Sequence, residues 1–283
     1  MPDPELDQSS MVAAFNRAAS HYQGAAKLQQ EIAQRLLARL AADTTLQPQW
    51  ILDMGCGTGM LTRGLAELYP KAHIVALDIA PSMLSEARKQ SPRWFSRQLF
   101  CAADAAELPF KADNFDLVVS NLMLQWCPDF LQVFNEVARI LSPQGHFLFS
   151  SFGPDTLTEL RASWASVDDK PHVNQFIDLH ALGDALQQAG LQQPVMDVDR
   201  ITMTFDDALA LMRNLKTIGA HNVAHERRRG LLGKAKLQRV IQAYESYRQS
   251  DGRLPASYEV TYGYAKAIAG VSGKLANIGI KVI

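Results

Sequence analysis

Two kinds of hydrophobic pattern alternate along the first 152 residues. Segments with apolar residues every three or four positions are typical of helices that bury one face. Between them lie short runs that are almost entirely apolar, as buried parallel strands are. Strands are predicted at Trp50–Asp53, Ala72–Asp78, Leu99–Asp104, Phe115–Asn121 and His146–Phe152, and the helices among them at 12–22, 25–41, 60–69, 81–90 and 130–141. Five strand–helix units in a row predict a parallel sheet with helices on both faces.

The rhythm changes after Phe152. Helices are predicted at 156–166, 179–189, 207–218 and 232–249, and strands at Val195–Phe205 and Tyr258–Tyr264. The two late strands can pair as a hairpin beside the fifth strand, with a helical insertion at 205–256 between them. An insertion of that length suggests a cap over a substrate site. We therefore expect one domain, residues 1–266, followed by a tail, 267–283, to which the sequence assigns no role.

Charge and cysteine content narrow the functional classes. The 283 residues carry 28 Lys and Arg against 29 Asp and Glu, which argues against wholesale electrostatic binding to nucleic acid or a membrane. No apolar run approaches the ~18 residues of a membrane span, and the acidic start MPDPELDQSS is unlike a secretory signal. Three cysteines without CxxC spacing argue against a zinc site or a disulfide framework. We expect a cytoplasmic protein without a metal.

The sharpest motif is ILDMGCGTG, Ile51–Gly59, where a strand meets a helix. Glycines at 55, 57 and 59 allow a tight turn and let a ligand approach the backbone amides. The sixth position of a dinucleotide fingerprint is Met60 here, and no Gly-Lys-Ser/Thr of a phosphate loop follows. Taken alone, the loop is also compatible with a plain tight turn.

Two aspartates strengthen a ligand-binding interpretation. Asp78 ends the second predicted strand, nineteen residues after Gly59, and Asp104 ends the third. A carboxylate at the first position can accept hydrogen bonds from a ribose diol, and one at the second from an adenine amine. Either aspartate alone is more often a cap or turn residue. Together with the glycines they predict an adenosyl-binding crevice at the carboxyl edge of the sheet.

These motifs resemble those of class I methyltransferases, which use S-adenosylmethionine. The resemblance rests on LDMGCGTG, Asp78, ADAAELPF and FDLVVSNLMLQW, in this order and at the usual spacing. It implies a Rossmann-like, doubly wound α/β fold with strand order 3-2-1-4-5-7-6. The cofactor residues that it implies are Asp53, Gly55, Cys56, Gly57, Gly59, Asp78, Ile79, Asp104, Ala105 and Asn121, with Tyr22 and Gln29 as candidates for closing over the cofactor.

The second half of the chain points to an acceptor. FGPDTLTELR, HVNQFIDLHALGDAL, MRNLKTIGAHN, RGLLGKAKL and LPASYEVTYGYA, with FNRAASHYQGAAKLQQEIA near the start, resemble the malonyl-acyl-carrier-protein O-methyltransferases of biotin synthesis. The resemblance covers about residues 11–266. Members of that family methylate the free carboxylate of a malonyl thioester, so that fatty-acid synthesis extends it toward pimelate. The implied partner is malonyl-acyl-carrier protein.

The chemistry of such a transfer places few demands on side chains. A sulfonium methyl is already activated and a malonyl carboxylate is ionised near pH 7, so the protein must align the partners and exclude water. Arg213 is the first candidate for orienting the carboxylate, because its planar fork is never neutral, although it can equally lie on the outer face of the insertion. Lys216, which can instead belong to a carrier dock, ranks second, and His221 and Asn222 are further candidates, with Gln125 and Trp126 as wall residues.

A basic stretch of the insertion is a candidate dock for the acidic carrier. Its residues are Lys216, Arg227, Arg228, Arg229, Lys234, Lys236 and Arg239. A solvated basic face is an equally good interpretation. An RNA substrate is disfavoured by the neutral net charge and by the lack of a recognised RNA-binding module. Two alternatives stay open: a methyltransferase of a quinone-like or sterol-like small molecule, and a non-catalytic adenosyl-binding scaffold, against which the intact Asp53, Asp78 and Asp104 argue.

Overall fold

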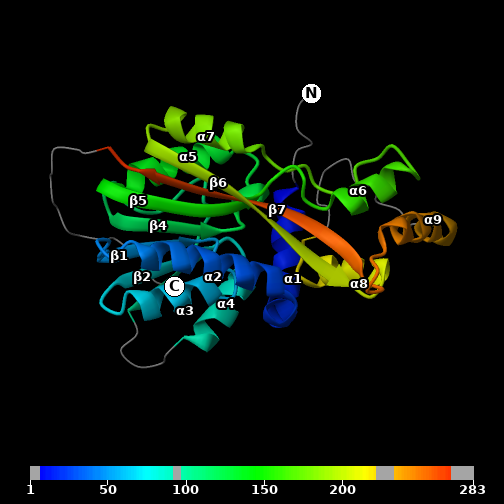
Figure 1. Ribbon diagram of the computed structural model, residues 1–283. Helices are drawn as coiled ribbons and strands as arrows, with labels where there is room; N and C mark the ends of the chain where they lie inside the picture. The colour runs from blue at the N-terminus through cyan, green and yellow to red at the C-terminus, as the bar shows by residue number, and fades with distance from the viewer. Residues whose placement is uncertain (1–6, 92–96, 221–232, 269–283) are drawn as a thin grey trace.

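A seven-stranded sheet with helices on both faces forms the body of the molecule (Figure 1). The computed structural model describes residues 7–91, 97–220 and 233–268. The strands lie in the order β3-β2-β1-β4-β5-β7-β6, which confirms the order that the methyltransferase resemblance implied. Their bounds are β1 Trp50–Met54, β2 His73–Asp78, β3 Gln98–Ala102, β4 Phe115–Asn121, β5 Leu141–Phe152, β6 Gln192–Phe205 and β7 Leu254–Lys266.

The first five strands are parallel, and β7 pairs antiparallel with both β5 and β6. The carboxyl ends of β1 to β5 therefore meet at one edge, where open α/β sheets bind ligands. The late hairpin is confirmed, with Gln192 opposite Lys266 and Phe205 opposite Leu254. β6 and β7 extend together beyond this edge and carry the insertion (Figure 1).

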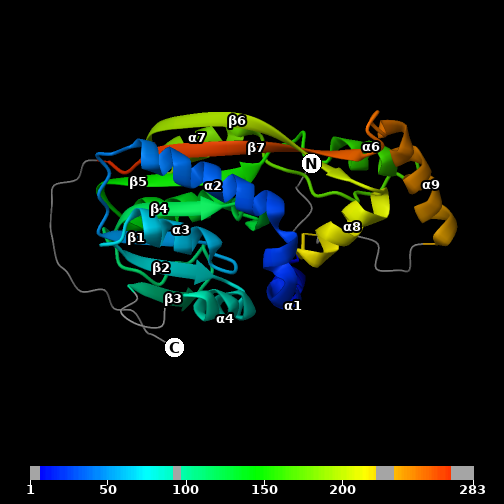
Figure 2. The ribbon, with the colours of Figure 1, turned by 60° about the horizontal axis from the view of Figure 1, so that its bottom comes forward.

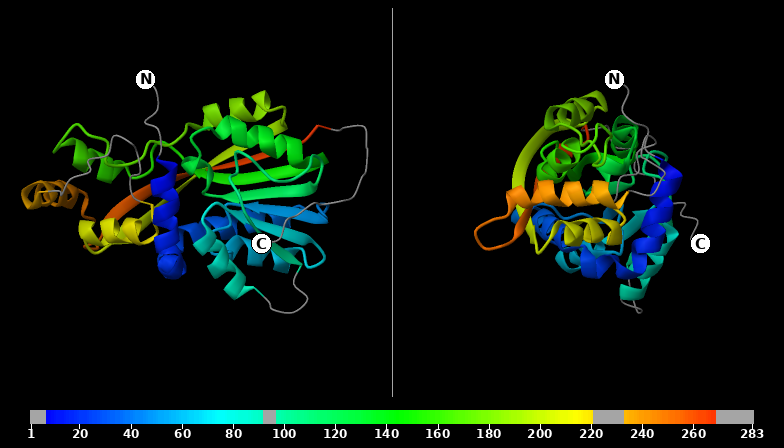
Figure 3. Two further views of the ribbon diagram at one scale, coloured as in Figure 1. Left: turned by 180° about the vertical axis from the view of Figure 1, so that it is seen from behind. Right: turned by 90° about the vertical axis from the view of Figure 1, so that its right-hand side faces the viewer.

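Helices α2 and α3 cover one face of the sheet, and α5 and α7 cover the other (Figures 2 and 3). The helix bounds are α1 Gln8–Ala25, α2 Lys27–Ala42, α3 Met60–Leu68, α4 Pro81–Gln90, α5 Phe130–Ile140, α6 Thr158–Ala165, α7 Leu179–Gln188, α8 Ala208–Thr217 and α9 Lys234–Tyr244, with short 3₁₀ turns η1 Leu124–Trp126 and η2 Glu245–Tyr247. Each predicted helix is present within a few residues. In the described parts of the chain no helix is long and apolar enough to cross a membrane.

The fifth strand differs slightly from expectation. The sequence SPQGH predicts a turn, yet β5 already begins at Leu141. Pairing with β4 passes from Phe115–Leu141 directly to Leu117–His146, so residues 142–145 bulge out of the ladder. The predicted turn is therefore present as a bulge within the strand. The Ser142 hydroxyl lies within hydrogen-bond distance of the Phe115 carbonyl and of Oδ1 of Asp116, at 3.1 Å each.

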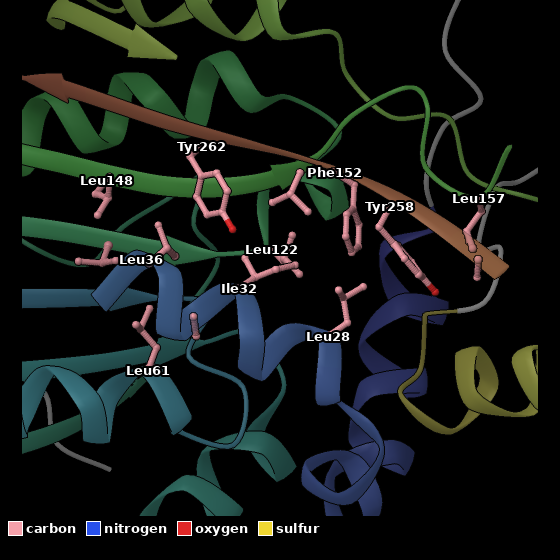
Figure 4. Close-up of a cluster of buried hydrophobic side chains, with 14 of the residues drawn as sticks. Leu28, Ile32, Leu36, Leu61, Leu122, Leu148, Phe152, Leu157, Tyr258 and Tyr262 are labelled. Carbon is pink, nitrogen blue, oxygen red and sulfur yellow. The ribbon is translucent and has the colours of Figure 1, made fainter. Parts of the chain in front are cut away.

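Two hydrophobic cores hold the layers together. Ile32 and Leu36 of α2 are fully buried against the sheet (Figure 4). On the opposite face Phe134 of α5 packs against Phe147 and Phe149 of β5. Burial of each such side chain contributes about 1.5–3 kcal/mol. Both faces of the central strands are covered, which is why their sequences read as continuous apolar runs.

The insertion lies next to the first helix. Asn214 of α8 donates its amide to the Ala25 carbonyl at 3.1 Å. Tyr244, at the end of α9, is fully buried and its hydroxyl donates to the Pro255 carbonyl at 2.8 Å. Beyond the carboxyl edge of the sheet, α8 lies beside α1 and α9 lies beside α6 (Figure 2).

Candidate functional site

The glycine loop turns tightly between β1 and α3. Gly55, Gly57 and Gly59 have φ of +78°, +53° and +76°, a region that side chains disfavour. A Cβ on Gly55 would lie 2.4 Å from Cγ of Met123, and one on Gly59 would lie 2.9 Å from Cβ of Ala87. The amides of residues 55 and 56 both donate to the Leu77 carbonyl at 2.8 Å. Glycine is thus required here by conformation at all three positions, and by crowding at two.

Asp78 joins the loop to the end of β2. Its Oδ2 accepts from the amide of Gly57 at 2.9 Å, and its Oδ1 accepts from the amide of Ala80 at 2.8 Å. Burial raises the pKa of the Asp78 carboxyl to about 6, so the group is mainly ionised at neutral pH. Burial, and then the Asp78 charge, raise the pKa of Tyr22 on α1, which keeps that phenol neutral.

Asp53 lies beneath the loop and supports it from below. It is fully buried, and its Oδ2 accepts from the Thr62 hydroxyl of α3 at 2.5 Å. Oδ1 has no hydrogen-bond partner in the described chain. Burial raises the pKa of Asp53 to about 7, and the nearby Asp78 charge adds to the effect. Thr62 is a supporting residue that the sequence reasoning missed; it stands nine positions after Asp53, in the helix that follows the motif.

A cavity of about 290 Å³, here called the glycine-loop cavity, opens above this turn. It collects most of the side chains and glycines that the sequence assigned to a cofactor. Those that line it are Tyr22, Gly55, Gly57, Asp78, Ile79, Asp104, Ala105 and Asn121. These residues come from α1 and from the ends of β1, β2, β3 and β4, which the sheet brings to one edge.

Four of the cofactor candidates do not line this cavity. Asp53 and Gly59 shape the turn instead. The Cys56 thiol is buried, which raises its pKa well above the ordinary value. Gln29 lies at the neighbouring cavity described below, and its carbonyl accepts from the Asn121 amide at 3.1 Å.

Helix α1 closes the glycine-loop cavity, which sequence reasoning largely missed. Nε2 of Gln8 donates to Oδ2 of Asp104 at 2.6 Å, while Oδ1 of Asp104 accepts from the Ala106 amide at 2.9 Å. Phe15 lines the cavity and meets Trp126 edge to face, with ring centroids 5.2 Å apart. The sequence pointed to Tyr22 of α1 as a residue over this crevice, but not to Gln8 or Phe15.

A second cavity of about 420 Å³, here called the cap cavity, lies between the sheet edge and the insertion. Leu28, Phe152, Leu157 and Tyr258 form part of its wall and come from four different elements or loops (Figure 4). Most of its lining is apolar, with residues of α6 and α8 completing it. Trp126 lines both cavities, so the two spaces meet at that ring.

The residues predicted to hold the acceptor differ in whether they line a cavity. Trp126 stands at the wall, as expected. Gln125 is buried away from both cavities, where its amide donates to the Leu122 carbonyl at 2.7 Å. Arg213 also lines neither cavity: its side chain is 69% exposed and lies 3.7 Å from Asp207. His221 and Asn222 lie outside the described residues.

The basic residues of the insertion differ in their exposure to solvent. Lys216, Lys234 and Arg239 are exposed. Lys236 is only 20% exposed and forms an ion pair with Asp168. Residues 227–229 lie outside the described parts of the chain.

Metal-ligating side chains are scattered over the part of the chain that the structure describes. There, no three of His, Cys, Asp and Glu gather in a way that could hold a metal ion. Cys56, Cys101 and Cys127 are free thiols.

Comparisons with known proteins agree with this geometry. A family model described as a methyltransferase domain matches residues 52–149. The fold is that of the YcgJ protein from Bacillus subtilis, with a TM-score of 0.60 at 16% identity, over 84% of this chain and 100% of that one.

Two curated relatives match far more closely in sequence. The biotin biosynthesis bifunctional protein BioHC of Saccharophagus degradans is 40% identical over 90% of this chain, which spans 46% of that longer protein. The malonyl-[acyl-carrier protein] O-methyltransferase of Gallionella capsiferriformans is 45% identical over 265 residues, covering 92% of this chain and 91% of the relative. On this match the chain belongs to the malonyl-[acyl-carrier protein] O-methyltransferase family.

Proposed function

We propose that the protein transfers a methyl group from S-adenosylmethionine to the free carboxylate of malonyl-acyl-carrier protein. The product is the malonyl methyl ester that primes pimeloyl synthesis for biotin. The observation that carries the proposal is the pair of cavities that meet at Trp126, one at the glycine loop and one beneath the insertion. A transfer between two bound partners needs two adjoining spaces of this kind.

The glycine-loop cavity fits an adenosyl cofactor. Asp78 is fixed by two backbone amides and is suited to accept from a ribose diol, and Asp104 stands ready for the adenine amine. Next to Gly57 there is open space, because a Cβ there would meet no atom closer than Cε1 of Tyr22 at 4.0 Å. When bound, S-adenosylmethionine supplies the methyl group of its sulfonium, and the sulfur that loses this group becomes a neutral thioether.

The protein's own contribution is alignment and dryness. Phe15 and Trp126 pack together at the junction of the cavities, and the largely apolar cap cavity keeps water from the acceptor. An ionised carboxylate that has lost part of its water reacts more readily, provided that the protein holds it in place. This arrangement requires no proton transfer, since the acceptor is ionised near neutral pH.

Arg213 was the first candidate for holding that carboxylate. Its exposed position gives this hypothesis no support, whereas its helix neighbours Met212 and Asn214 do line the cap cavity. The hypothesis is tested by Arg213→Ala with cofactor affinity as the control. Turnover close to that of the wild type would eliminate Arg213, and a loss of turnover alone would restore it.

The exposed cations of the insertion support docking of an acidic carrier protein. Lys216 of α8 and Lys234 and Arg239 of α9 face solvent, and α8 lines the cap cavity, where a phosphopantetheine arm would enter. Lys236 is engaged by Asp168 and is therefore assigned a different role below. We also propose that the enzyme works in the cytoplasm, which the free thiols of its three cysteines support.

The largely apolar lining of the cap cavity also favours, as a second candidate, a small apolar acceptor such as a quinone. The formation of S-adenosylhomocysteine, measured with each candidate acceptor, distinguishes the two functions. We expect turnover with malonyl carrier protein and none with acetyl carrier protein, which lacks the carboxylate. Turnover with a quinone and none with malonyl carrier protein would overturn the proposed function.

A further inference from the structure

His172, Asp168 and Lys236 form a chain of polar contacts that begins at the wall of the cap cavity, and the function described so far uses none of them. Nε2 of His172 lies 2.8 Å from Oδ1 of Asp168, and Nζ of Lys236 pairs with Oδ2 of the same carboxylate. The side chains of His172 and Asp168 are 12% and 13% exposed. The trio joins the loop after α6 to helix α9 of the insertion.

The imidazole of His172 is held in one orientation. Its ring stacks on Trp164 with centroids 3.7 Å apart and planes 13° apart. A carboxylate only accepts hydrogen bonds, so Nε2 carries the proton that faces Asp168. The other nitrogen, Nδ1, has no hydrogen bond to any described residue, and His172 lines the cap cavity. In the imidazolium form Nδ1 is a donor, ready for a ligand.

Asp168 supplies the negative charge beside this ring. Burial alone would raise the pKa of this carboxyl, but hydrogen bonds from Lys236, from the Lys170 amide and from His172 hold it well below its ordinary range. Asp168 is thus ionised at neutral pH and accepts from Nε2 of His172. With the imidazolium the trio carries a net charge of +1, and a ligand carboxylate would bring the group to neutrality.

We propose that His172, oriented by Asp168 and Trp164, holds the carboxylate of the acceptor in the cap cavity. This inference rests on the proposed function and names the residue that binds the acceptor's carboxylate. A carboxylate moved out of water needs a partner of this kind, because its desolvation is otherwise costly. One oxygen on Nδ1 leaves the other free to receive the methyl group.

Asn174 supplies an independent reason to expect a ligand beside His172. Its amide oxygen is buried without a hydrogen-bond partner in the described chain, and the residue lines the same cavity. An unsatisfied buried acceptor costs about 1–3 kcal/mol, which a ligand N–H would recover. A phosphopantetheine arm carries amide N–H groups, so a malonyl-pantetheine matches both the cation and the free oxygen.

Other cationic groups at this cavity fit less well. Among the described lining residues, only Lys27 shares with His172 the capacity to carry a positive charge. Lys27 is exposed, and its ammonium is strongly hydrated on a flexible stem. Asn214 already donates its amide to Ala25.

The test compares carriers with and without the carboxylate. His172→Gln can keep a donor toward Asp168 while it removes the charged donor at Nδ1. The KM for malonyl carrier protein and the inhibition constant of acetyl carrier protein are measured for both enzymes. In the His172→Gln enzyme we expect kcat/KM for malonyl carrier protein to fall about 10- to 100-fold. The inhibition constant of acetyl carrier protein should stay within about 2-fold of the wild-type value. Lys27→Met is the matched control and should leave the malonyl preference intact.

Asp168→Asn gives a second test, because Asp168 does not line the cavity. It should produce the same malonyl-specific loss, with unchanged affinity for S-adenosylmethionine. Equal losses on both carriers in the His172 variant, no loss, or a malonyl-specific loss in Lys27→Met would each overturn the inference. A wild-type enzyme that fails to methylate malonyl carrier protein would instead refute the proposed function itself.

Discussion

Replacing Asp78 by asparagine should weaken binding of S-adenosylmethionine by about 10- to 150-fold. The variant keeps an oxygen for the Ala80 amide but loses the negative charge and one acceptor site. A buried charge-assisted hydrogen bond contributes about 1.5–3 kcal/mol, and each 1.4 kcal/mol is about tenfold in affinity. Titration calorimetry measures the dissociation constant, with Asp184→Asn, an exposed aspartate of α7, as the matched control.

The pH dependence of the same measurement sharpens the test. Burial raises the pKa of Asp78 to about 6, and the ionised form is the better acceptor for ribose hydroxyls. Affinity of the wild type should therefore fall as the pH drops through about 6, and Asp78→Asn should lack that step. An unchanged dissociation constant in a folded variant, or the same pH step in both proteins, would refute the role assigned to Asp78.

Three further predictions follow from particular contacts. Gly55→Ala should lower the free energy of unfolding by at least about 2 kcal/mol in urea titrations, whereas Gly24→Ala, with nothing within 4 Å, should not. Asp53→Asn should be more stable than wild type at pH 8 by up to about 4 kcal/mol, from about 1.4 kcal/mol per pKa unit between 3.8 and about 7. Wild type loses this stability as pH rises through that window, so the gap should close toward pH 4; a constant gap would contradict the argument. Lys234→Glu with Arg239→Glu should raise the KM for malonyl carrier protein at low salt but hardly affect malonyl-CoA, and equal effects would contradict a docking role.

The fold was predictable because its signals are local. Strands buried on both faces read as apolar runs, and the sheet brings their carboxyl ends to one edge. That rule is sufficient to place the glycine loop, Asp78 and Asp104 at one cavity, whereas Asn121 came from the resemblance to methyltransferases. It gave no information about Gln8, whose contact with Asp104 spans 96 positions and depends on how α1 packs.

The acceptor side was harder to predict because it forms from long-range contacts. On α8 the buried residues Ala208 and Leu211 define the inner face, and Arg213 lies on the outer one. The periodicity of α8 is visible in the sequence and is enough to place Arg213 on the outer face. No local pattern marks His172, because the ion pair that completes the trio joins Asp168 to Lys236 across 68 positions of the chain.

The central claim is most directly tested by the intact mass of malonyl carrier protein after incubation with the enzyme and S-adenosylmethionine. The account predicts a gain equal to one CH₂ group on malonyl carrier protein and no gain on acetyl carrier protein. Malonyl carrier protein of unchanged mass, in the presence of an enzyme that binds S-adenosylmethionine, would contradict it.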